Sequence, residues 1–290
     1  MTSGRVSARG STRAPAWSHS ALTIARKVTE LLIVAAALAA GVCALAWWAQ
    51  ERLIFFPQPL ASTAHLPARA IPLDVVAADG SRLAGFLVPG ATAPAPAVIY
   101  FGGNAEEASW VLTEARWPGD YTLAAVNYRG YGKSEGEPGE RALTEDALAI
   151  YDAIARRPDV DPQRIFIYGR SLGTAVAAYV AAARPVAGVI LASPFDSLVA
   201  VGRQHYPWLP VSLLLRHRFN AASLARGIHA PMLALVGDAD PIVSPARSRA
   251  LFDAWAGPKT WQVIAGANHN DLGAHTAFWD SVVAFLRARR

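Results

Sequence analysis

Gly169-Arg170-Ser171-Leu172-Gly173 places a serine between two glycines, where a strand-like run meets a helix-like run. Residues 164–168 precede the motif, and the alanine-rich residues 172–183 follow it. Glycines two residues before and after the serine permit a tight strand-to-helix turn that presents the hydroxyl. The pattern predicts a nucleophile elbow, with Ser171 as the nucleophile.

A second match to the same pattern, Gly132-Lys133-Ser134-Glu135-Gly136, lacks this context. It is followed by Glu137-Pro138-Gly139, which is typical of a turn and cannot open a helix. Short patterns of this kind also arise by chance. The flanking elements therefore favour Ser171 over Ser134.

A serine hydroxyl is a weak nucleophile near neutral pH, so it needs a base, and the base needs an acid that fixes its tautomer. The loop after the apolar run 232–235 carries Asp238 and Asp240, and the loop after Ile264 carries His269. Parallel sheets place ligand chemistry beyond the carboxyl ends of their strands. The spacing predicts that these loops meet at Ser171.

One histidine and one aspartate are preferred for these roles. Of the seven histidines, only His269 and His275 follow the last strand-like run, and His275 begins the final helix-like run. We therefore expect His269 to be the base. Asp240 is preferred as the acid because it lies further into its loop than Asp238. The alternative for either aspartate is a carboxylate that caps a turn.

Hydrolysis at such a serine passes through a tetrahedral oxyanion, which preorganised backbone amides stabilise. We expect one amide at Leu172, in the elbow. The second is expected at Asn104, because Gly102-Gly103-Asn104-Ala105 follows a strand-like run and lets the backbone approach a substrate. Asn104 as a simple helix cap is compatible with the same role. No metal-ligand cluster or phosphate-binding glycine loop occurs, so we predict no metal and no cofactor.

The elements that must position these residues alternate between strand and helix. A hairpin around Ala78-Asp79-Gly80-Ser81 comes first, and continuous apolar strands separated by helices then predict an α/β fold, with a mostly parallel sheet covered on both faces. The alternation breaks at about 196–229, which we interpret as a small cap. We expect strands at 73–77, 83–88, 97–101, 122–126, 164–168, 188–191, 232–235 and 260–264, and helices at 105–115, 141–156, 172–183, 244–256 and 277–289.

The N-terminal part has a different composition. We predict a basic, disordered tail at 1–27, a transmembrane signal anchor at 28–50, a linker at 51–69 with exposed Phe55 and Phe56, and the folded domain at 70–290. The anchor holds a charge-free apolar run, 31–49, whose length as a helix is close to the thickness of a bilayer.

Charges and aromatic residues orient this anchor. Arg26 and Lys27 precede the run, and Trp47 and Trp48 close it. The positive-inside rule then predicts a single-pass protein with a cytoplasmic N-terminus and an extracytoplasmic, periplasmic catalytic domain. One alternative is a cleaved signal peptide, because small residues stand at 44 and 46. A lipoprotein at Cys43, the only cysteine, is a weaker alternative.

Net charge argues against a nucleic-acid partner. The chain carries +5 overall, but residues 1–50 hold five Arg or Lys residues and one Glu, which account for +4. The rest of the chain is therefore nearly neutral, and it lacks a basic stripe with interleaved aromatic residues.

Together these motifs resemble the membrane-anchored bacterial α/β-hydrolase family, whose eukaryotic relatives include lysophospholipid and protein-depalmitoylating hydrolases. The resemblance covers about 50–290 and is carried by residues 100–106, 127–134 and 169–173 and by the two later loops. It implies an α/β-hydrolase fold with Ser171, Asp240 and His269 as the triad, and with Asn104 and Leu172 as oxyanion donors. Many relatives have His-Gly where this chain has Gly102-Gly103.

The expected function is a serine hydrolase that cleaves carboxylic esters or thioesters through an acyl-serine intermediate. The anchor and the apolar residues of the cap favour a small-molecule or lipid-like acyl substrate. Peptide or amide hydrolysis by the same triad is the alternative within this chemistry. A membrane-tethered scaffold without activity is disfavoured, because nucleophile, base, acid and oxyanion loop are all present.

Overall fold

The computed structural model describes residues 19–289, and the chain divides into two compact units, Met1–Ala46 and Trp47–Arg290. The described residues of the first unit belong to one long helix, α1 (His19–Ile54), which continues into the second unit. Most of the predicted disordered tail, 1–18, lies outside the described residues. Its last part is helical instead, because good helix formers there are joined by an Arg26–Glu30 pair one turn apart.

Helix α1 is a candidate membrane span. Residues Ala21–Ile54 are long and apolar enough to cross a bilayer, and no other helix in the described part of the chain meets that test. The helix extends past both ends of the predicted anchor, 28–50, because the flanking charged residues also favour helix. The last turn of α1, residues 51–54, is helical where the linker was expected to begin.

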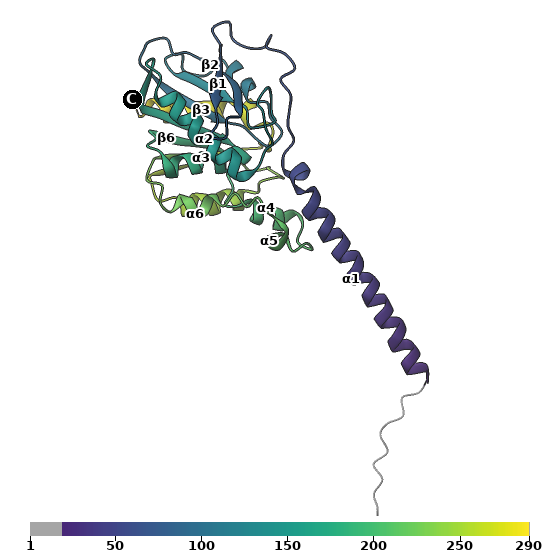
Figure 1. Cartoon of the computed structure of the whole chain (residues 1–290). Coiled ribbons are helices and arrows are strands. Elements are labelled where there is room, and N and C mark those ends of the chain that lie inside the picture. The colour runs from purple at the N-terminus through teal and green to yellow at the C-terminus, as the bar shows by residue number, and fades with distance from the viewer. Residues whose placement is uncertain (1–18, 290) are drawn as a thin grey trace, which may run out of the picture. The chain divides into compact units, whose positions relative to one another are not determined.

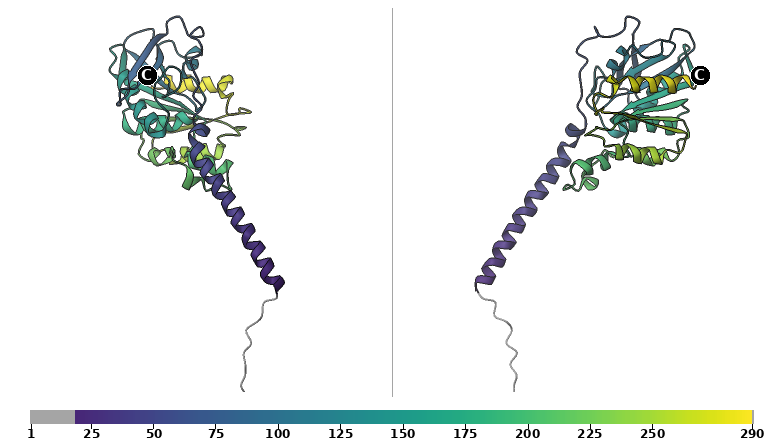
Figure 2. Two further views of the ribbon diagram at one scale, coloured as in Figure 1. Left: turned by 45° about the vertical axis from the view of Figure 1, so that its right-hand side comes forward. Right: turned by 180° about the vertical axis from the view of Figure 1, so that it is seen from behind.

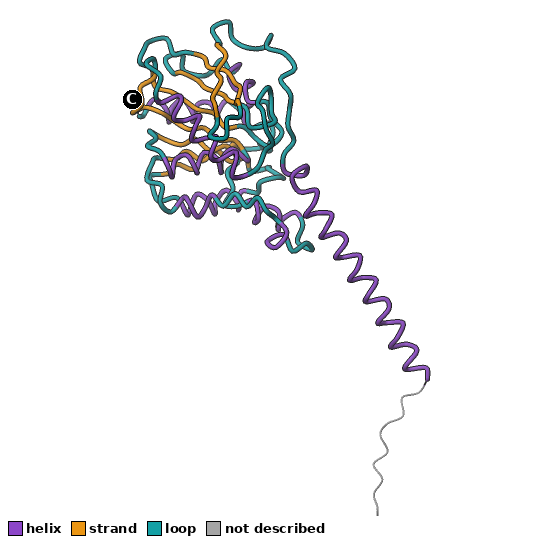
Figure 3. The backbone as a smooth tube through the Cα atoms, viewed as in Figure 1, coloured by secondary structure: helices purple, strands orange, loops and turns teal. Residues whose placement is uncertain are grey.

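Eight strands form one sheet in the order β1-β2-β4-β3-β5-β6-β7-β8. Figure 1 labels β1, β2, β3 and β6 of this sheet. β2 pairs antiparallel with β1 and with β4, and every other pairing is parallel. Figure 3 shows these strands in orange, gathered between helices. The mostly parallel α/β sheet is confirmed. The strands are β1 (Ile71–Val76), β2 (Arg82–Val88), β3 (Ala95–Phe101), β4 (Thr122–Val126), β5 (Val160–Arg170), β6 (Gly188–Ala192), β7 (Met232–Gly237) and β8 (Lys259–Ile264).

Two apolar cores lie on the two faces of this sheet. One packs α2 (Glu140–Ala155), α3 (Leu172–Ala183) and α7 (Pro245–Ala254) against it. The other packs α8 (Thr276–Arg287), the yellow helix that Figure 2 shows from behind, together with the short 3-10 helix η1 (Ala108–Thr113). α3 is rich in alanine, so it can approach the sheet closely and lies almost entirely buried.

Two expectations for the segments beside the site are wrong. The predicted helix at 105–115 is only a 3-10 helix, η1 (Ala108–Thr113), which begins after Glu107, whose carboxylate accepts the Ser109 N–H. Phe55, expected to be exposed, is 3% exposed and belongs to the core, whereas Phe56 remains exposed. The chain that leaves α1 is thus part of the folded body from its first residues.

The cap is smaller than predicted. Within 196–229 the structure has α4 (Leu198–His205), α5 (Val211–Leu214) and α6 (Ala221–Ala225). α6 packs against α3, and its first and last alanines are fully buried, so it is part of the core layer. The cap therefore consists of α4, α5 and the segments that join them.

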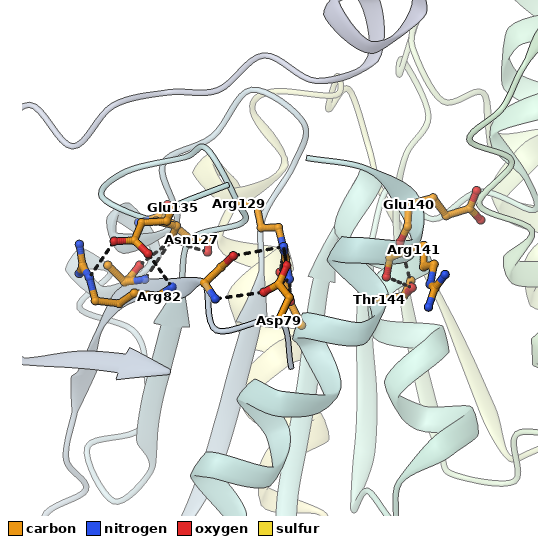
Figure 4. Close-up of polar contacts among 12 residues, drawn as sticks. Asp79, Arg82, Asn127, Arg129, Glu135, Glu140, Arg141 and Thr144 are labelled. Atoms are coloured by element: carbon orange, nitrogen blue, oxygen red, sulfur yellow. Dashed lines mark hydrogen bonds and ion pairs between the residues drawn. The ribbon is translucent and has the colours of Figure 1, made fainter. Parts of the chain in front are cut away.

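Arg129, in the loop after β4, joins three elements near the site. It binds Asp146 of α2 through two hydrogen bonds of 2.6 and 2.7 Å, and it binds Asp79 in the β1–β2 turn (Figure 4). The Asp146 side chain is only 4% exposed, so its charge depends on this partner. Arg129 thereby fixes the hairpin and the loop after β4 against α2.

We expect Arg129→Met to lower the free energy of unfolding by about 3 kcal/mol, because the Asp146 carboxylate would stay buried without a counter-charge. The measurement is urea unfolding in detergent. Arg82→Met is the matched control, since Arg82 pairs with Asp74 on the surface and such pairs contribute about 1 kcal/mol or less. Equal losses for the two variants would contradict the assignment.

Candidate active site

Ser171 occupies a sharp turn between β5 and α3. Its backbone φ is +50°, a value that residues other than glycine rarely adopt. The two motif glycines permit this turn by close packing: a Cβ at Gly173 would lie 2.0 Å from the Phe101 carbonyl oxygen, and one at Gly169 would lie 2.3 Å from the Gly173 carbonyl oxygen. The elbow therefore depends on both glycines, and it presents Ser171 at the carboxyl end of β5.

The structure brings Ser171, His269 and Asp240 together in a hydrogen-bonded chain. His269 Nε2 lies 2.9 Å from Ser171 Oγ, and His269 Nδ1 lies 2.8 Å from Asp240 Oδ2. An ionised carboxylate can only accept, so Nδ1 carries the proton and Nε2 accepts from the serine hydroxyl. This is the arrangement by which an imidazole takes a proton from an attacking serine.

Asp240 is held as an ionised carboxylate. Oδ1 accepts the backbone N–H groups of Ile242 and Val243, and Oδ2 accepts the Ser193 hydroxyl at 2.8 Å in addition to His269. Burial favours a higher pKa for Asp240, but the bonds from His269, Val243 and Ser193 outweigh it and lower the pKa below its ordinary value. The negative charge is thus kept beside the imidazole.

The rival residues have structural contacts. Asp238 Oδ1 accepts the Gly266 N–H at 2.7 Å, which joins the loop after β7 to the turn after β8. Ser134 is buried, and its hydroxyl bonds the backbone of β2 and of Asn127. His275 precedes the first residue of α8. None of these side chains hydrogen-bonds Ser171.

The expected oxyanion donors border Ser171. Leu172 is the first residue of α3, so its N–H has no acceptor within the helix. The glycine-rich loop also passes beside the nucleophile, because a Cβ at Gly103 would lie 3.8 Å from Ser171 Cβ. Within residues 19–289 neither the Leu172 N–H nor the Asn104 N–H donates to another protein group. Both N–H groups can therefore donate to an anionic oxygen.

The end of α1 holds Asn104. The Asn104 side chain donates to the Ile54 carbonyl oxygen at 3.0 Å, and the Phe56 N–H donates to the Asn104 carbonyl oxygen at 3.0 Å. That carbonyl also accepts the Tyr131 hydroxyl at 2.6 Å. Sequence reasoning missed this contact, because it placed the chain after residue 50 in a linker.

A second group of residues that sequence reasoning missed joins three loops of the site. Glu106 Oε2 accepts the Gly103 N–H at 2.9 Å and the Arg170 guanidinium at 3.0 Å, and Arg170 also donates to the His269 carbonyl oxygen at 3.1 Å. Tyr100 donates its hydroxyl to Glu106. Burial and the Glu106 charge raise the pKa of Tyr100 well above its ordinary value, so it stays a donor. The sequence signal was that residues 100–106 and Arg170 belong to the motifs that carry the family resemblance, but no role was assigned to these side chains.

We expect Glu106→Gln to lower kcat by about 10- to 100-fold with little change in KM, because the bonds that hold the glycine loop against the elbow are lost and small misplacements are costly. Steady-state kinetics on a soluble ester measures both constants. Glu114→Gln is the control, since Arg116 is the only ion-pair partner of Glu114 within residues 19–289. A rise in KM at constant kcat would show that Glu106 acts in substrate binding instead.

Comparison with known proteins finds a hydrolase family model and several relatives that match this chain. A family model described as serine aminopeptidase, S33, matches residues 92–214. An uncharacterized protein of Mycobacterium tuberculosis is 38% identical over 250 residues, which are 84% of this chain and 89% of that protein. An uncharacterized membrane protein of Saccharomyces cerevisiae is 34% identical over 167 residues, which are 55% of this chain and 58% of the yeast protein.

Solved structures share the fold. An esterase of Pyrococcus furiosus superposes with a TM-score of 0.63 at 18% identity, over 81% of this chain and 97% of the esterase. At that identity the likeness shows the fold alone.

Proposed function

Because this chain belongs to the α/β-hydrolase family, we propose that it is a serine hydrolase that cleaves carboxylic esters or thioesters through an acyl-serine intermediate. The observation that carries the proposal is the hydrogen-bonded chain from Ser171 Oγ through His269 to Asp240. Membership of the family supports hydrolysis in general, and the geometry of the site supports the acyl-transfer mechanism.

In the proposed mechanism, Ser171 Oγ attacks the acyl carbon while its proton passes to His269 Nε2. Asp240 stabilises the imidazolium that forms, and the Leu172 and Asn104 amides bind the oxyanion. Collapse of the tetrahedral intermediate breaks the bond to the leaving alcohol or thiol, which takes the proton from His269. Water, activated by the same imidazole, then releases the acid and restores Ser171.

We propose a lipid-like acyl group as the substrate class. The cap lies against the loop that carries Asp240: His205 Nε2 of α4 is 2.8 Å from the Ile242 carbonyl oxygen, and Gln204 accepts the Ser244 hydroxyl at 2.7 Å. Beyond α4 the cap exposes large apolar side chains. A cap of this kind beside the site supports binding of an acyl chain.

Amide or peptide hydrolysis is the second candidate. It is favoured by the description of the matching family model, a serine aminopeptidase, and it requires the same triad. Amines leave less readily than alcohols or thiols, so the two candidates differ in relative rate and not in machinery.

A matched substrate series separates these candidates. One acyl group is presented as an oxyester, a thioester and an amide, and kcat/KM is measured for each, followed by a series of acyl-chain lengths on the preferred leaving group. We expect the esters to exceed the amide and longer chains to exceed acetyl. The amide as the best substrate would favour the peptidase, and absence of both turnover and fluorophosphonate labelling would favour an inactive scaffold.

The apolar helix and the yeast membrane relative indicate membrane association. We propose that α1 crosses the membrane with its N-terminus in the cytoplasm and the hydrolase domain on the periplasmic side, since Arg26 and Lys27 precede the apolar run. Alkaline phosphatase, which is active only outside the cytoplasm, is fused after Gln50 to test this. An inactive fusion, present at normal amounts, contradicts the orientation.

A further inference from the structure

The cap carries a group of large apolar side chains that the fold leaves uncovered. Between α4 and α5 and within α5, Tyr206 is 52% exposed, Trp208 is 68% exposed and Leu213 is 83% exposed. Tyr206 and Trp208 contact each other edge to face, with ring centroids 6.4 Å apart. Single exposed apolar residues are ordinary, but a tryptophan, a tyrosine and a leucine on one short segment mark an interaction surface.

This segment is fastened to the last turns of α1. The buried Gln50 side chain donates to the Leu214 carbonyl oxygen at 3.2 Å and accepts the Arg216 N–H at 2.7 Å. Both α5 and the chain after it are thereby held at the level of Gln50. Leu213 is the neighbour of Leu214, and Gln50 follows directly on the apolar run that ends at residue 49.

Two exposed tryptophans of α1, each with an arginine over its ring, occupy the same level. Trp47 and Trp48 are 48% and 64% exposed. Arg216 lies over the Trp47 ring at 4.8 Å, and Arg52 lies over the Trp48 ring at 5.5 Å. At the boundary between acyl chains and head groups, tryptophan is enriched, and arginine keeps its guanidinium group on the polar side.

We propose that Tyr206, Trp208 and Leu213, which we call the cap surface, insert into the bilayer interface that α1 enters. The occupant is lipid because the cap is hydrogen-bonded to Gln50, in the turn of α1 at which the apolar run 31–49 ends, so the cap surface lies at the depth of Trp47 and Trp48. Arg52 and Arg216, which lie over the Trp48 and Trp47 rings, place positive charge at this level for head-group phosphates, although Arg216 also pairs with Glu51 at 3.3 Å. The cap then meets the membrane, and substrates partitioned there have a short path to the site.

The test uses the full chain with Cys43→Ser, reconstituted in nanodiscs of phosphatidylcholine and phosphatidylglycerol. Single cysteines are placed by Trp208→Cys and Leu213→Cys and labelled with bimane. Quenching is measured with lipids that carry a nitroxide at a shallow or a deep position of the acyl chain. Val76→Cys, in β1 and also 68% exposed, is the matched control, and Leu38→Cys in α1 reports the span itself.

We expect quenching at 208 and 213 to exceed that at 76 several-fold and to be stronger for the shallow nitroxide, with 38 quenched by the deep one. Quenching at 208 and 213 as low as at 76 overturns the proposal. A shielded label at 208 and 213 without lipid quenching also overturns it, in favour of a protein partner or a second copy. If the label at position 38 is not quenched by the deep nitroxide, α1 does not span the bilayer and the proposal is overturned.

A measurement without labels guards against a perturbing probe. Intrinsic tryptophan fluorescence is quenched with lipids brominated on the acyl chain, in Trp208→Phe and in Trp110→Phe. Trp110 is 57% exposed but lies in η1, whose buried apolar residues belong to the other apolar core than the buried residue of α4. We expect Trp208→Phe to lower the quenched fraction and Trp110→Phe to leave it unchanged; the reverse order contradicts the proposal.

Discussion

Ser171→Ala is expected to lower kcat by about a million-fold and to abolish labelling by a fluorophosphonate, because the covalent route through the acyl-serine is lost. His269 and Asp240 keep their own hydrogen bond of 2.8 Å, so the pocket stays formed and substrate binding persists. Single-turnover kinetics with an activated ester measures the loss, and labelling of the intact protein reports the reactive serine directly.

Ser134→Ala is the matched control, since Ser134 lies in the other glycine-flanked motif. Its hydroxyl accepts the Ala84 N–H at 2.9 Å and donates to the Asn127 carbonyl oxygen at 2.9 Å, so its loss costs about 1–3 kcal/mol of stability. Labelling should be unchanged. If Ser171→Ala were still labelled, or if folded Ser134→Ala were not labelled, the assignment of Ser171 as the nucleophile would be wrong.

Asp240→Asn is the second change with a large expected effect, a fall in kcat of about ten-thousand-fold. The asparagine amide can keep the bonds from Ile242 and Val243 through its oxygen, so the loop should stay in place. Its NH₂ group would then face His269 Nδ1 as a donor, which moves the imidazole proton to Nε2 and removes the base from Ser171. Pre-steady-state acylation kinetics measures the fall.

Asp238→Asn supplies the control for this loop. Among the described residues, Asp238 accepts only the Gly266 N–H, at 2.7 Å. An asparagine oxygen can accept the same bond, so activity should stay within a few-fold of the unmodified protein. Both variants must retain the thermal midpoint of the parent chain. If Asp238→Asn caused the larger loss in kcat, the acid would have to be reassigned.

The sequence was most informative for strands and helices whose own residues determine their structure. The apolar strands and the alanine-rich helix were recognised because burial on both sides requires uninterrupted apolar residues, and the predicted helix 172–183 coincides with α3. The loops that carry Asp240 and His269 were placed by the general position of chemistry at the carboxyl ends of parallel strands. Their proximity to Ser171 therefore needed only the order of strands.

What escaped prediction depends on partners distant in the chain. Glu106 and Arg170 are 64 residues apart, and Ser193 lies 47 residues before Asp240. No local sequence pattern identifies such pairs, because a carboxylate that pairs within the site and a carboxylate exposed to solvent look the same in the sequence. Phe55 was placed in a linker for the same reason: its burial against the core is decided by residues far along the chain, including His217 at a ring-centroid distance of 5.1 Å.

The hydrogen bond between Asn104 and the Ile54 carbonyl oxygen bears on how a water-soluble version of this hydrolase can be prepared. Trimming the gene to the first strand, near residue 70, would delete a partner of the glycine-rich loop and a core phenylalanine along with the anchor. A version that begins at Trp47 keeps Gln50, Ile54 and Phe55 in place. The useful boundary for protein engineering therefore lies inside the helix, about two turns before its end.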